Sequence, residues 1–344
     1  MRRIETIVLV LALGFYAWFL AHFGFSRVFG YVRIVGWGLG LTIALESLAR
    51  IANTLGWRVT IRDYPGALGF PQLFGARVAG EAVDYVTPSA QLGGQFVMAL
   101  MVRRKLRMPA GLATVAVAAL AEAIGQIVFV GMALMISLEL VRMQERLHLP
   151  ILGGFALAVA LAAGFFFVQT KKPFSHILHA AEKLDPRIDT DEIEEAAEDA
   201  DAVLLDFYAN HRVRLILSCL CYLAAWSFGP LEIYILLRLL HQPASLEIAM
   251  MVEAIGLLIE RATFLIPAKL VSQEGGKALI LAMLGYPAGV GFAVGFLRRL
   301  KEMVWVMIGL LSLMFHRMVV EKSGDTNSVE AAGQVLEIQR VQGE

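Results

Sequence analysis

The sequence predicts an all-α polytopic membrane protein with about six full spans and two re-entrant or broken-helix hairpins, arranged as two inverted repeats. Apolar residues make up 58% of the 344 residues and charged residues only 17%. The mean hydropathy is +0.66. Soluble domains average about 45–50% apolar and about 25% charged residues. The excess of apolar residues indicates a chain that lies in lipid rather than in water.

Several stretches have the length of one membrane span, which is about 20 apolar residues. The predicted full spans are 4–23, 29–50, 109–140, 150–170, 213–240 and 290–316. The first stretch lacks a small-residue cleavage site, so we interpret it as a retained helix and not as a signal peptide.

Two further stretches, 66–102 and 246–286, are apolar but interrupted. The interruptions contain Thr87-Pro88, Gly93, Gly94, Pro267, Gly275 and Gly276. Each half is short for a full crossing. Each stretch is therefore predicted to be a re-entrant hairpin or a pair of short helices.

Basic residues indicate the orientation, because the cytoplasmic loops of membrane proteins are enriched in Lys and Arg. In the six-span arrangement most of them fall on one side: Arg2, Arg3, Arg50, Arg58, Arg62, Arg103, Arg104, Lys105, Arg107, Lys171, Lys172, Arg212, Arg214, Arg317 and Lys322. Both termini are therefore predicted to be cytoplasmic, with the chain in the cell (inner) membrane.

The chain divides into two membrane halves, 1–170 and 212–316. An acidic cytoplasmic connector helix is predicted within 171–211, and we expect it either to join the halves or to bind a partner. The tail at 317–344 is polar and is expected to be disordered.

The two interrupted stretches match each other in spacing. Glu81 precedes Pro88 by the same interval by which Glu260 precedes Pro267. A second glutamate, Glu122 or Glu302, follows each proline at nearly equal distance. With the orientation given above, the repeats run in opposite directions across the membrane. Inverted repeats in transporters place binding sites near mid-membrane, at broken helices.

Ionisable side chains in the predicted spans need partners, because each costs on the order of 3 kcal/mol in a bilayer. Spacing of four residues places two side chains on one helix face. This spacing pairs Arg77 with Glu81, Glu46 with Arg50, and Arg298 with Glu302. We interpret Glu46 and Arg50 as a plain structural pair near a helix end.

Glu122 lacks a Lys or Arg neighbour within one helical turn, and Gln126 is its polar neighbour. It is predicted to be protonated or to bind a partner from another helix, as a structural bond or as a proton or headgroup site. Arg298 and Arg299 outweigh the local glutamate. We hypothesise that one of them binds an anionic headgroup as a bidentate fork, with Glu260, Glu274 or Glu122 as alternative partners.

The segments after the two breaks can cap the helices that follow, or bind an anion at the helix N-terminus. The candidate substrate-binding residues are Arg77, Glu81, Asp84, Gln91, Gln95, Glu122, Gln126, Glu260, Lys269, Gln273, Glu274, Arg298, Arg299 and Glu302. The helix-break residues are Pro88, Gly93, Gly94, Pro267, Gly275 and Gly276.

The sequence contains no enzyme signature: no metal-spaced His/Cys set, no Walker loop and no Gly-x-Ser-x-Gly elbow. Cys219 and Cys221 lie in an apolar run, which argues against a disulfide or zinc site. We predict no catalytic residue, no metal and no cofactor. The formal net charge of zero gives no indication of a nucleic-acid partner.

The segments from Glu81 to Gly94 and from Pro267 to Gly276 resemble the two halves of a flippase-like family. That family is typified by the transmembrane region of lysylphosphatidylglycerol synthase. Ala268 and Lys269 stand where the family commonly has glycines. The resemblance covers most of residues 1–316 and extends to small proteins associated with hopanoid biosynthesis. It implies movement of lipids or lipid-linked molecules between leaflets, and we expect no soluble aminoacyl-transferase domain.

We therefore predict a lipid flippase or transporter with a polar mid-membrane cavity, in which cations hold a phosphate and glutamates hold a cationic group or a proton. The alternatives are a membrane-embedded lipid-modifying enzyme, with Glu122 or Glu302 as acid or base, and a scaffold of a lipid-synthesis complex joined through the acidic helix.

Overall fold

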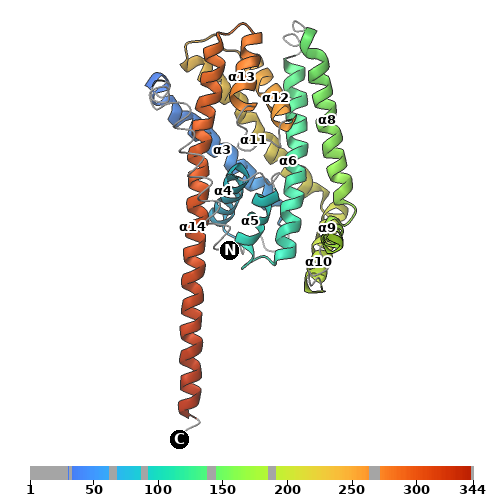
Figure 1. Cartoon of the computed structure of the whole chain (residues 1–344), viewed down its shortest axis with the longest axis vertical. Coiled ribbons are helices and arrows are strands. Elements are labelled where there is room, and N and C mark those ends of the chain that lie inside the picture. The colour runs from blue at the N-terminus through green and yellow to red at the C-terminus, as the bar shows by residue number, and fades with distance from the viewer. Residues whose placement is uncertain are drawn as a thin grey trace.

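The computed structural model describes residues 30, 33–61, 68–86, 92–137, 145–184, 191–262 and 272–341, and it confirms an all-helical fold over these residues (Figure 1). The helices in chain order are α3 (Gly38–Thr60), α4 (Phe70–Val86), α5 (Leu92–Val102), α6 (Met108–Ile136), α8 (Glu145–Gln169), α9 (Pro173–Leu184), α10 (Asp191–Asn210), α11 (Arg212–Leu239), α12 (Leu246–Ala262), α13 (Ser272–Met283) and α14 (Ala288–Val341). The predicted first span, 4–23, lies outside the described residues.

Three described helices are long and apolar enough to cross a membrane: α6, α11 and the part of α8 from Ile151 to Gln169. Helix α6 has a proline in its first turn, where the missing backbone N–H removes no helical hydrogen bond. Helix α8 lies at the edge of the bundle beside α6, and most of its side chains are exposed (Figure 1). These features agree with a polytopic membrane protein.

Helix α3 does not have the predicted bounds of 29–50. A turn at Gly36, whose φ is +56°, precedes it, and the helix runs to Thr60. Glu46 and Arg50 therefore lie in the middle of α3, and their predicted place near a helix end is wrong. A central position leaves a charged side chain no short path to the interface, so both residues need partners inside the bundle.

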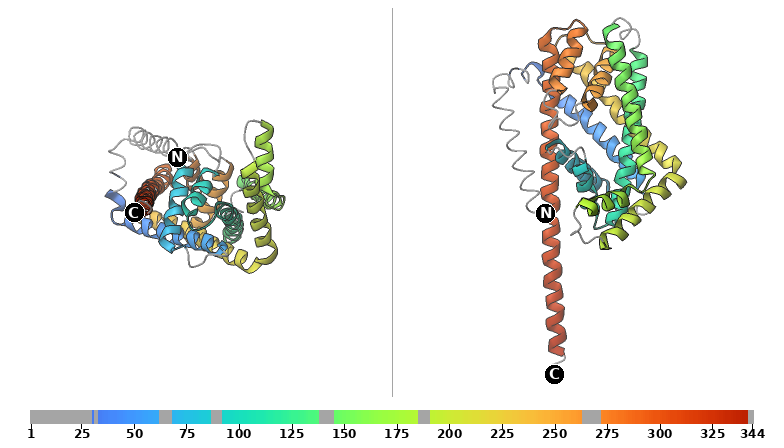
Figure 2. Two further views of the ribbon diagram at one scale, coloured as in Figure 1. Left: turned by 90° about the horizontal axis from the view of Figure 1, so that it is seen from below. Right: turned by 45° about the vertical axis from the view of Figure 1, so that its right-hand side comes forward.

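Helix α14 is also longer than the predicted span 290–316. It continues to Val341 and extends alone beyond the bundle, on the side where α9 and α10 lie (Figure 2). The expectation of a disordered tail at 317–344 is therefore wrong for the helical part of that segment.

In its described residues each interrupted stretch contains two helices, which agrees with the predicted pair of short helices. Helices α4 and α5 pack side by side, as do α12 and α13, and the two pairs lie toward opposite ends of the bundle (Figure 1). The backbone N–H of Gly94 donates to Asp84 Oδ1 at 2.7 Å, which ties the start of α5 to the end of α4. Ser245 caps α12 by accepting from the N–H of Ile248 at 3.2 Å.

The glycine pairs are not in the breaks themselves. Gly93 and Gly94 lie in the first turn of α5, and Gly275 and Gly276 lie in the first turn of α13. Pro88 and Pro267 belong to the segments 87–91 and 263–271, which lie outside the described residues. The glycines permit close packing instead: a Cβ on Gly276 would contact the Ile259 side chain at 3.5 Å.

The connector contains two helices, α9 and α10, where one was predicted. Asp201 on α10 accepts from the backbone N–H groups of Phe174 at 3.1 Å and Ser175 at 2.9 Å, and so caps α9. Burial of the Tyr208 hydroxyl raises its pKa, so the hydroxyl stays protonated and donates to Gln169. Leu204 packs with apolar residues of α6, which fixes the connector to the bundle.

Gly80 tests the close packing of α4 on α5. A Cβ there would lie 2.6 Å from Met98 Cγ and 2.7 Å from the carbonyl oxygen of Gly94. Because the second neighbour is backbone, Gly80→Ala should destabilise the protein by about 1–3 kcal/mol, measured as a lower melting temperature of the purified protein in detergent. Gly164→Ala on α8 is the control, since a Cβ there meets no atom within 4 Å. Equal melting temperatures for the two variants would contradict the close packing.

Candidate functional site: a buried ion-pair network

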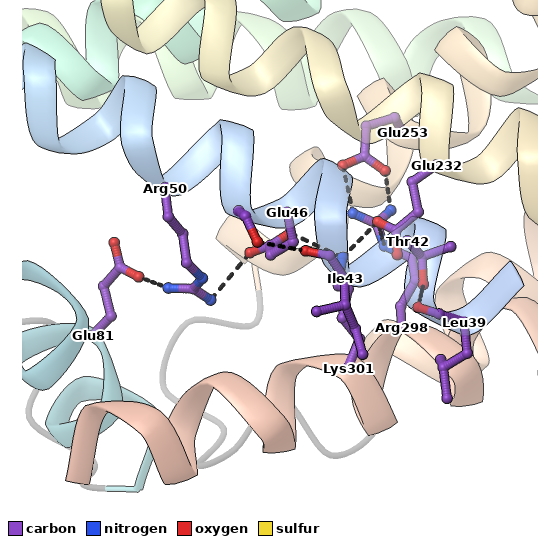
Figure 3. A network of polar contacts seen from close by, with 11 residues as sticks. Leu39, Thr42, Ile43, Glu46, Arg50, Glu81, Glu232, Glu253, Arg298 and Lys301 are labelled. Carbon is purple, nitrogen blue, oxygen red and sulfur yellow. Dashed lines mark hydrogen bonds and ion pairs between the residues drawn. The ribbon is translucent and has the colours of Figure 1, made fainter. Parts of the chain in front are cut away.

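A chain of alternating acidic and basic side chains joins helices of the bundle, and Figure 3 shows its part from Glu81 to Glu253. Six of its links join different helices, and two lie within one helix at i,i+4 spacing, so a local pattern specifies only those two. Named so that each residue contacts the next, its members are Glu122, Arg77, Glu81, Arg50, Glu46, Lys301, Glu232, Arg298 and Glu253. We call this set the ion-pair network.

Arg77 on α4 joins the first part of the network. Its Nε donates to Glu81 Oε1 at 2.7 Å, and its Nη2 donates to Glu122 Oε2 at 2.8 Å. Its Nη1 lies 3.4 Å from the Tyr222 hydroxyl, and its guanidinium lies 5.6 Å from the centre of the Tyr222 ring. The predicted pair of Arg77 and Glu81 is confirmed, and the partner of Glu122 comes from another helix, which was one of the two predicted outcomes.

Arg50 on α3 lies in the middle of the network and joins its two parts. It binds Glu46 on its own helix at 3.1 Å and Glu81 on α4. Its guanidinium also lies over the Trp305 ring, 4.7 Å from the ring centre. The predicted pair of Glu46 and Arg50 is therefore confirmed, but the interpretation as an isolated local pair is wrong, because both residues have further partners on other helices.

Lys301 and Arg298 on α14 form the most buried part. Lys301 Nζ donates to Glu46 Oε2 at 2.9 Å and to Glu232 Oε2 at 2.6 Å. Arg298 Nε lies 3.2 Å from Glu232 Oε2, and its two Nη groups donate to the two oxygens of Glu253, one of them at 3.0 Å. The side chains of Lys301, Glu232 and Glu253 are at most 5% exposed.

These contacts correct the predicted partners of Arg298. The anions that bind it are Glu232 and Glu253, and neither was among the predicted partners. Helix α11 runs through Pro230 and places Glu232 well inside it. The i,i+4 spacing of Arg298 and Glu302 suggested a local pair; Glu302 lies near both Arg298 and Arg50.

The other predicted site residues have varied positions. Arg299 is fully buried and Gln126 is 7% exposed, while Gln95 is half-buried on α5. Asp84 holds the α4–α5 pair together through its bond to Gly94. Four predicted positions lie outside the described residues or have undescribed side chains, and the binding roles predicted for them stay predictions: Gln91, Lys269, Gln273 and Glu274. The same holds for the side chain of Glu260 on α12.

Sequence reasoning missed Glu253, Glu232, Lys301 and Tyr222 as members or neighbours of the site. Tyr222 is fully buried, and its ring packs against Gly56, where a Cβ would lie 2.7 Å from a ring carbon. A charged residue inside an apolar helix is the sequence feature that could have identified such residues. Glu253 and Glu232 both have this feature.

The network lies between apolar clusters. On α3 the charged residues fall between Leu39, which packs against one cluster, and Trp57, which belongs to another. On α14 they fall between Leu297 and Val306, which again belong to different clusters. On α11, Glu232 lies between Tyr222 of one cluster and Ile233 of the other. The site is therefore a polar layer with apolar packing on both sides.

The interhelical ion pairs described above share one arrangement. Each joins α4 or α14 to one of α3, α6, α11 and α12. Helices α4 and α14 pack tightly on each other, since a Cβ on Gly309 would lie 2.6 Å from Ala82 Cβ. We call the boundary between the α4–α14 pair and the other four helices the seam.

The seam is not equally closed along its length. The side chains of Glu46, Glu81 and Glu122 are 23%, 27% and 26% exposed, whereas those of Glu232 and Glu253 are 3% and 5% exposed. The carboxylates toward the first half of the chain therefore keep access to a small polar group.

The long apolar helices and the buried charged layer between them define the chain as a polytopic membrane protein. Comparison with known families matches residues 6–309 to the Lysylphosphatidylglycerol synthase TM region family. Because the match covers most of the chain, the protein belongs to this family, a membrane domain linked to lipid modification or flipping. Comparison with curated proteins and with solved structures gave no match.

Arg77 provides a test of the network. It is the partner of Glu122 within the described residues, so Arg77→Met should leave that carboxylate unpaired and cost about 3–5 kcal/mol of stability. Adding Glu122→Gln should restore part of the loss, because no unpaired charge then remains. Thermal melting of the purified variants in detergent gives the measurement.

Arg107→Ala is the matched control for this series. It removes an ion pair with Asp199 at 3.2 Å, whose side chains are 77% and 45% exposed. Exposed pairs contribute about 0–1 kcal/mol, so its melting temperature should stay near that of the wild type. If the double variant melts below Arg77→Met, the two residues do not act as a pair.

Proposed function

We propose that the protein is a lipid flippase, or a transporter of a lipid-linked molecule, which moves a polar headgroup along the seam. The observation that carries this proposal is the charged layer between two apolar clusters. Burying ions costs several kcal/mol each, and replacing a buried ion pair by apolar residues is often neutral or stabilising. A charged layer of this size therefore suggests that these residues bind a polar group, beyond any contribution to stability.

The two apolar clusters suggest how the headgroup would pass. Transport by alternating access needs a polar site that is closed from either side in turn. In our proposal the cluster with Trp57 and Leu73 closes one side, and the cluster with Leu237 and Val252 closes the other. The ion pairs across the seam then separate and exchange partners with the headgroup.

The helix packing supports the inverted repeats as part of this proposal. Each broken helix pair packs on the helix that follows it, α5 on α6 and α13 on α14. Each also packs on the corresponding helix of the other half, α4 on α14 and α12 on α6. Helix α3 of the first half packs along α11 of the second half. This reciprocal pattern is what a pseudo-two-fold axis in the membrane plane produces.

The orientation and the absence of catalysis belong to the same proposal. Both termini would be cytoplasmic, which places α9, α10 and the extension of α14 on that side of an inner membrane. We propose no catalytic step, no cofactor and no metal, and the partner is the lipid substrate. The hopanoid-associated branch of the family stays a prediction.

Translocation by the purified protein in liposomes tests the proposal. Fluorescent phospholipids with different headgroups would be placed in both leaflets, and dithionite would quench the outer leaflet. The wild type should make the inner pool of at least one headgroup accessible faster than protein-free liposomes do. Mass spectrometry of the recovered lipids would identify chemical conversion, which favours the enzyme alternative. Neither translocation nor conversion would favour the scaffold.

Glu122→Gln tests the role of the network in this activity. A carboxamide has nearly the same size and still accepts a hydrogen bond from Arg77, so stability should change little. The charge balance across the seam changes, so we expect translocation to fall about tenfold or more at equal reconstitution. Equal losses of melting temperature and transport would instead indicate that the residue only holds the structure together. Arg107→Ala, with its exposed pair, is the control for surface charge.

A further inference from the structure

Two buried N–H donors in the seam, those of Arg50 Nε and Trp305 Nε1, have no acceptor in the part of the chain that the structure describes. Arg50 uses its two Nη groups on Glu81 and Glu46, but its Nε–H has no acceptor among the described residues. The same is true of the Trp305 indole Nε1–H. The two residues are only 9% and 6% exposed. Buried donors without acceptors are rare in folded proteins and call for an explanation.

These two donors belong to neighbouring side chains from opposite sides of the seam. Arg50 comes from α3 and Trp305 from α14, and the guanidinium carbon lies 4.7 Å from the centre of the indole ring. The stacking of a cation on the ring fixes the orientation of both groups. The stacked pair therefore brings two donors and one positive charge close together across the seam.

The chemistry of the pair selects its ligand. Guanidinium and indole nitrogens only donate hydrogen bonds, so the ligand must accept them. The positive charge favours an anion, and Arg is suited to planar or tetrahedral oxyanions such as phosphate.

Other charged groups face Arg50, and they decide when an anion can bind. Glu46 faces it from α3, Glu81 from α4 and Glu302 from α14, whereas Lys301 on α14 binds Glu46. The bond between Arg50 and Glu81 crosses the seam, but the bond between Arg50 and Glu46 lies within α3. Loss of the Glu81 bond, with Arg50 still stacked on Trp305, would therefore leave Arg50 able to bind an anion in place of that carboxylate.

We infer that Arg50 and Trp305 form an oxyanion site that binds the phosphate group of the transported molecule when Glu81 releases Arg50 and the stacked pair stays together. This inference rests on the proposed function, since it names the residues that would recognise the substrate. It assigns Arg50 and Trp305 a binding role that is distinct from the hypothesis for Arg298, whose guanidinium is already bound to Glu232 and Glu253.

Trp305→Phe tests the site with minimal change, because it keeps an aromatic ring under Arg50 and removes only the N–H donor. Trp226→Phe is the matched control. Trp226 Nε1 is also buried without an acceptor among the described residues, but it packs in an apolar cluster with Phe155 and Leu258. Arg50→Lys is a second variant, which keeps the charge and removes the Nε–H.

Binding would be measured by native mass spectrometry of the purified full chain with three probes: dihexanoyl phosphatidic acid, dihexanoylglycerol and inorganic phosphate. We expect Trp305→Phe and Arg50→Lys each to weaken binding of phosphatidic acid about tenfold, as loss of one hydrogen bond to a charged group does. Trp226→Phe should bind like the wild type, and dihexanoylglycerol binding should be the same in all variants.

The probes also distinguish the source of the phosphate. Weaker binding of phosphatidic acid alone identifies a lipid headgroup, and weaker binding of inorganic phosphate as well identifies a site for phosphate from either source. Unchanged binding in Trp305→Phe, an equal loss in Trp226→Phe, or a wild type that binds neither phosphate probe would overturn the inference. Melting temperatures of the variants show whether each is folded.

Binding and transport can fail separately. If the wild type translocates lipids but Trp305→Phe binds phosphatidic acid like the wild type, the oxyanion site is wrong and the flippase stands. If Trp305→Phe weakens binding as expected but the wild type translocates no lipid, the site stands and the proposed function is wrong.

Discussion

The cost of placing charge inside a bilayer is the constraint on which the rest of this structure depends. Arg77, Arg50, Lys301 and Arg298 lie in the interior of a helical bundle, and each is bound to carboxylates from other helices. A chain that carries these residues in its apolar helices can fold only if the helices meet where the charges can pair. The arrangement of six helices around one layer follows from that requirement.

Small residues and apolar clusters provide the helix packing around the charged layer. Glycines such as Gly80, Gly56 and Gly309 bring backbones close together, as membrane helices require when no hydrophobic force drives them together. The clusters on both sides of the charged layer keep it away from the aqueous phases. Packing is thus tight within the α4–α14 pair, whereas the boundary with the other helices is crossed by ion pairs. A boundary of this kind can separate and re-form at lower cost than a fully interdigitated core, because a polar headgroup can replace each broken ion pair.

The sequence was informative about positions and less so about partners. The breaks near Pro88 and Pro267, the pair of Arg77 and Glu81, and the need of Glu122 for a partner could all be predicted, because local spacing and the cost of buried charge decide them. The centre of α3 was misplaced, because the apolar run begins before the helix does. Glu46 and Arg50 were consequently interpreted as a local pair. Arg298 was given the wrong anions, since nothing in a helical period indicates which distant helix lies opposite.

The sequence by itself determined that this is a helical membrane protein with two interrupted stretches and with charges in its spans, because hydropathy, proline position and i,i+4 spacing are local properties. Only the tertiary structure decided that α3, α4, α6, α11, α12 and α14 share one ion-pair network. It also decided that Glu232 and Glu253 belong to that network and that the Arg50 guanidinium stacks on the Trp305 ring. These pairings join residues far apart in the chain, and they depend on how helices cross and not on the sequence around any one residue.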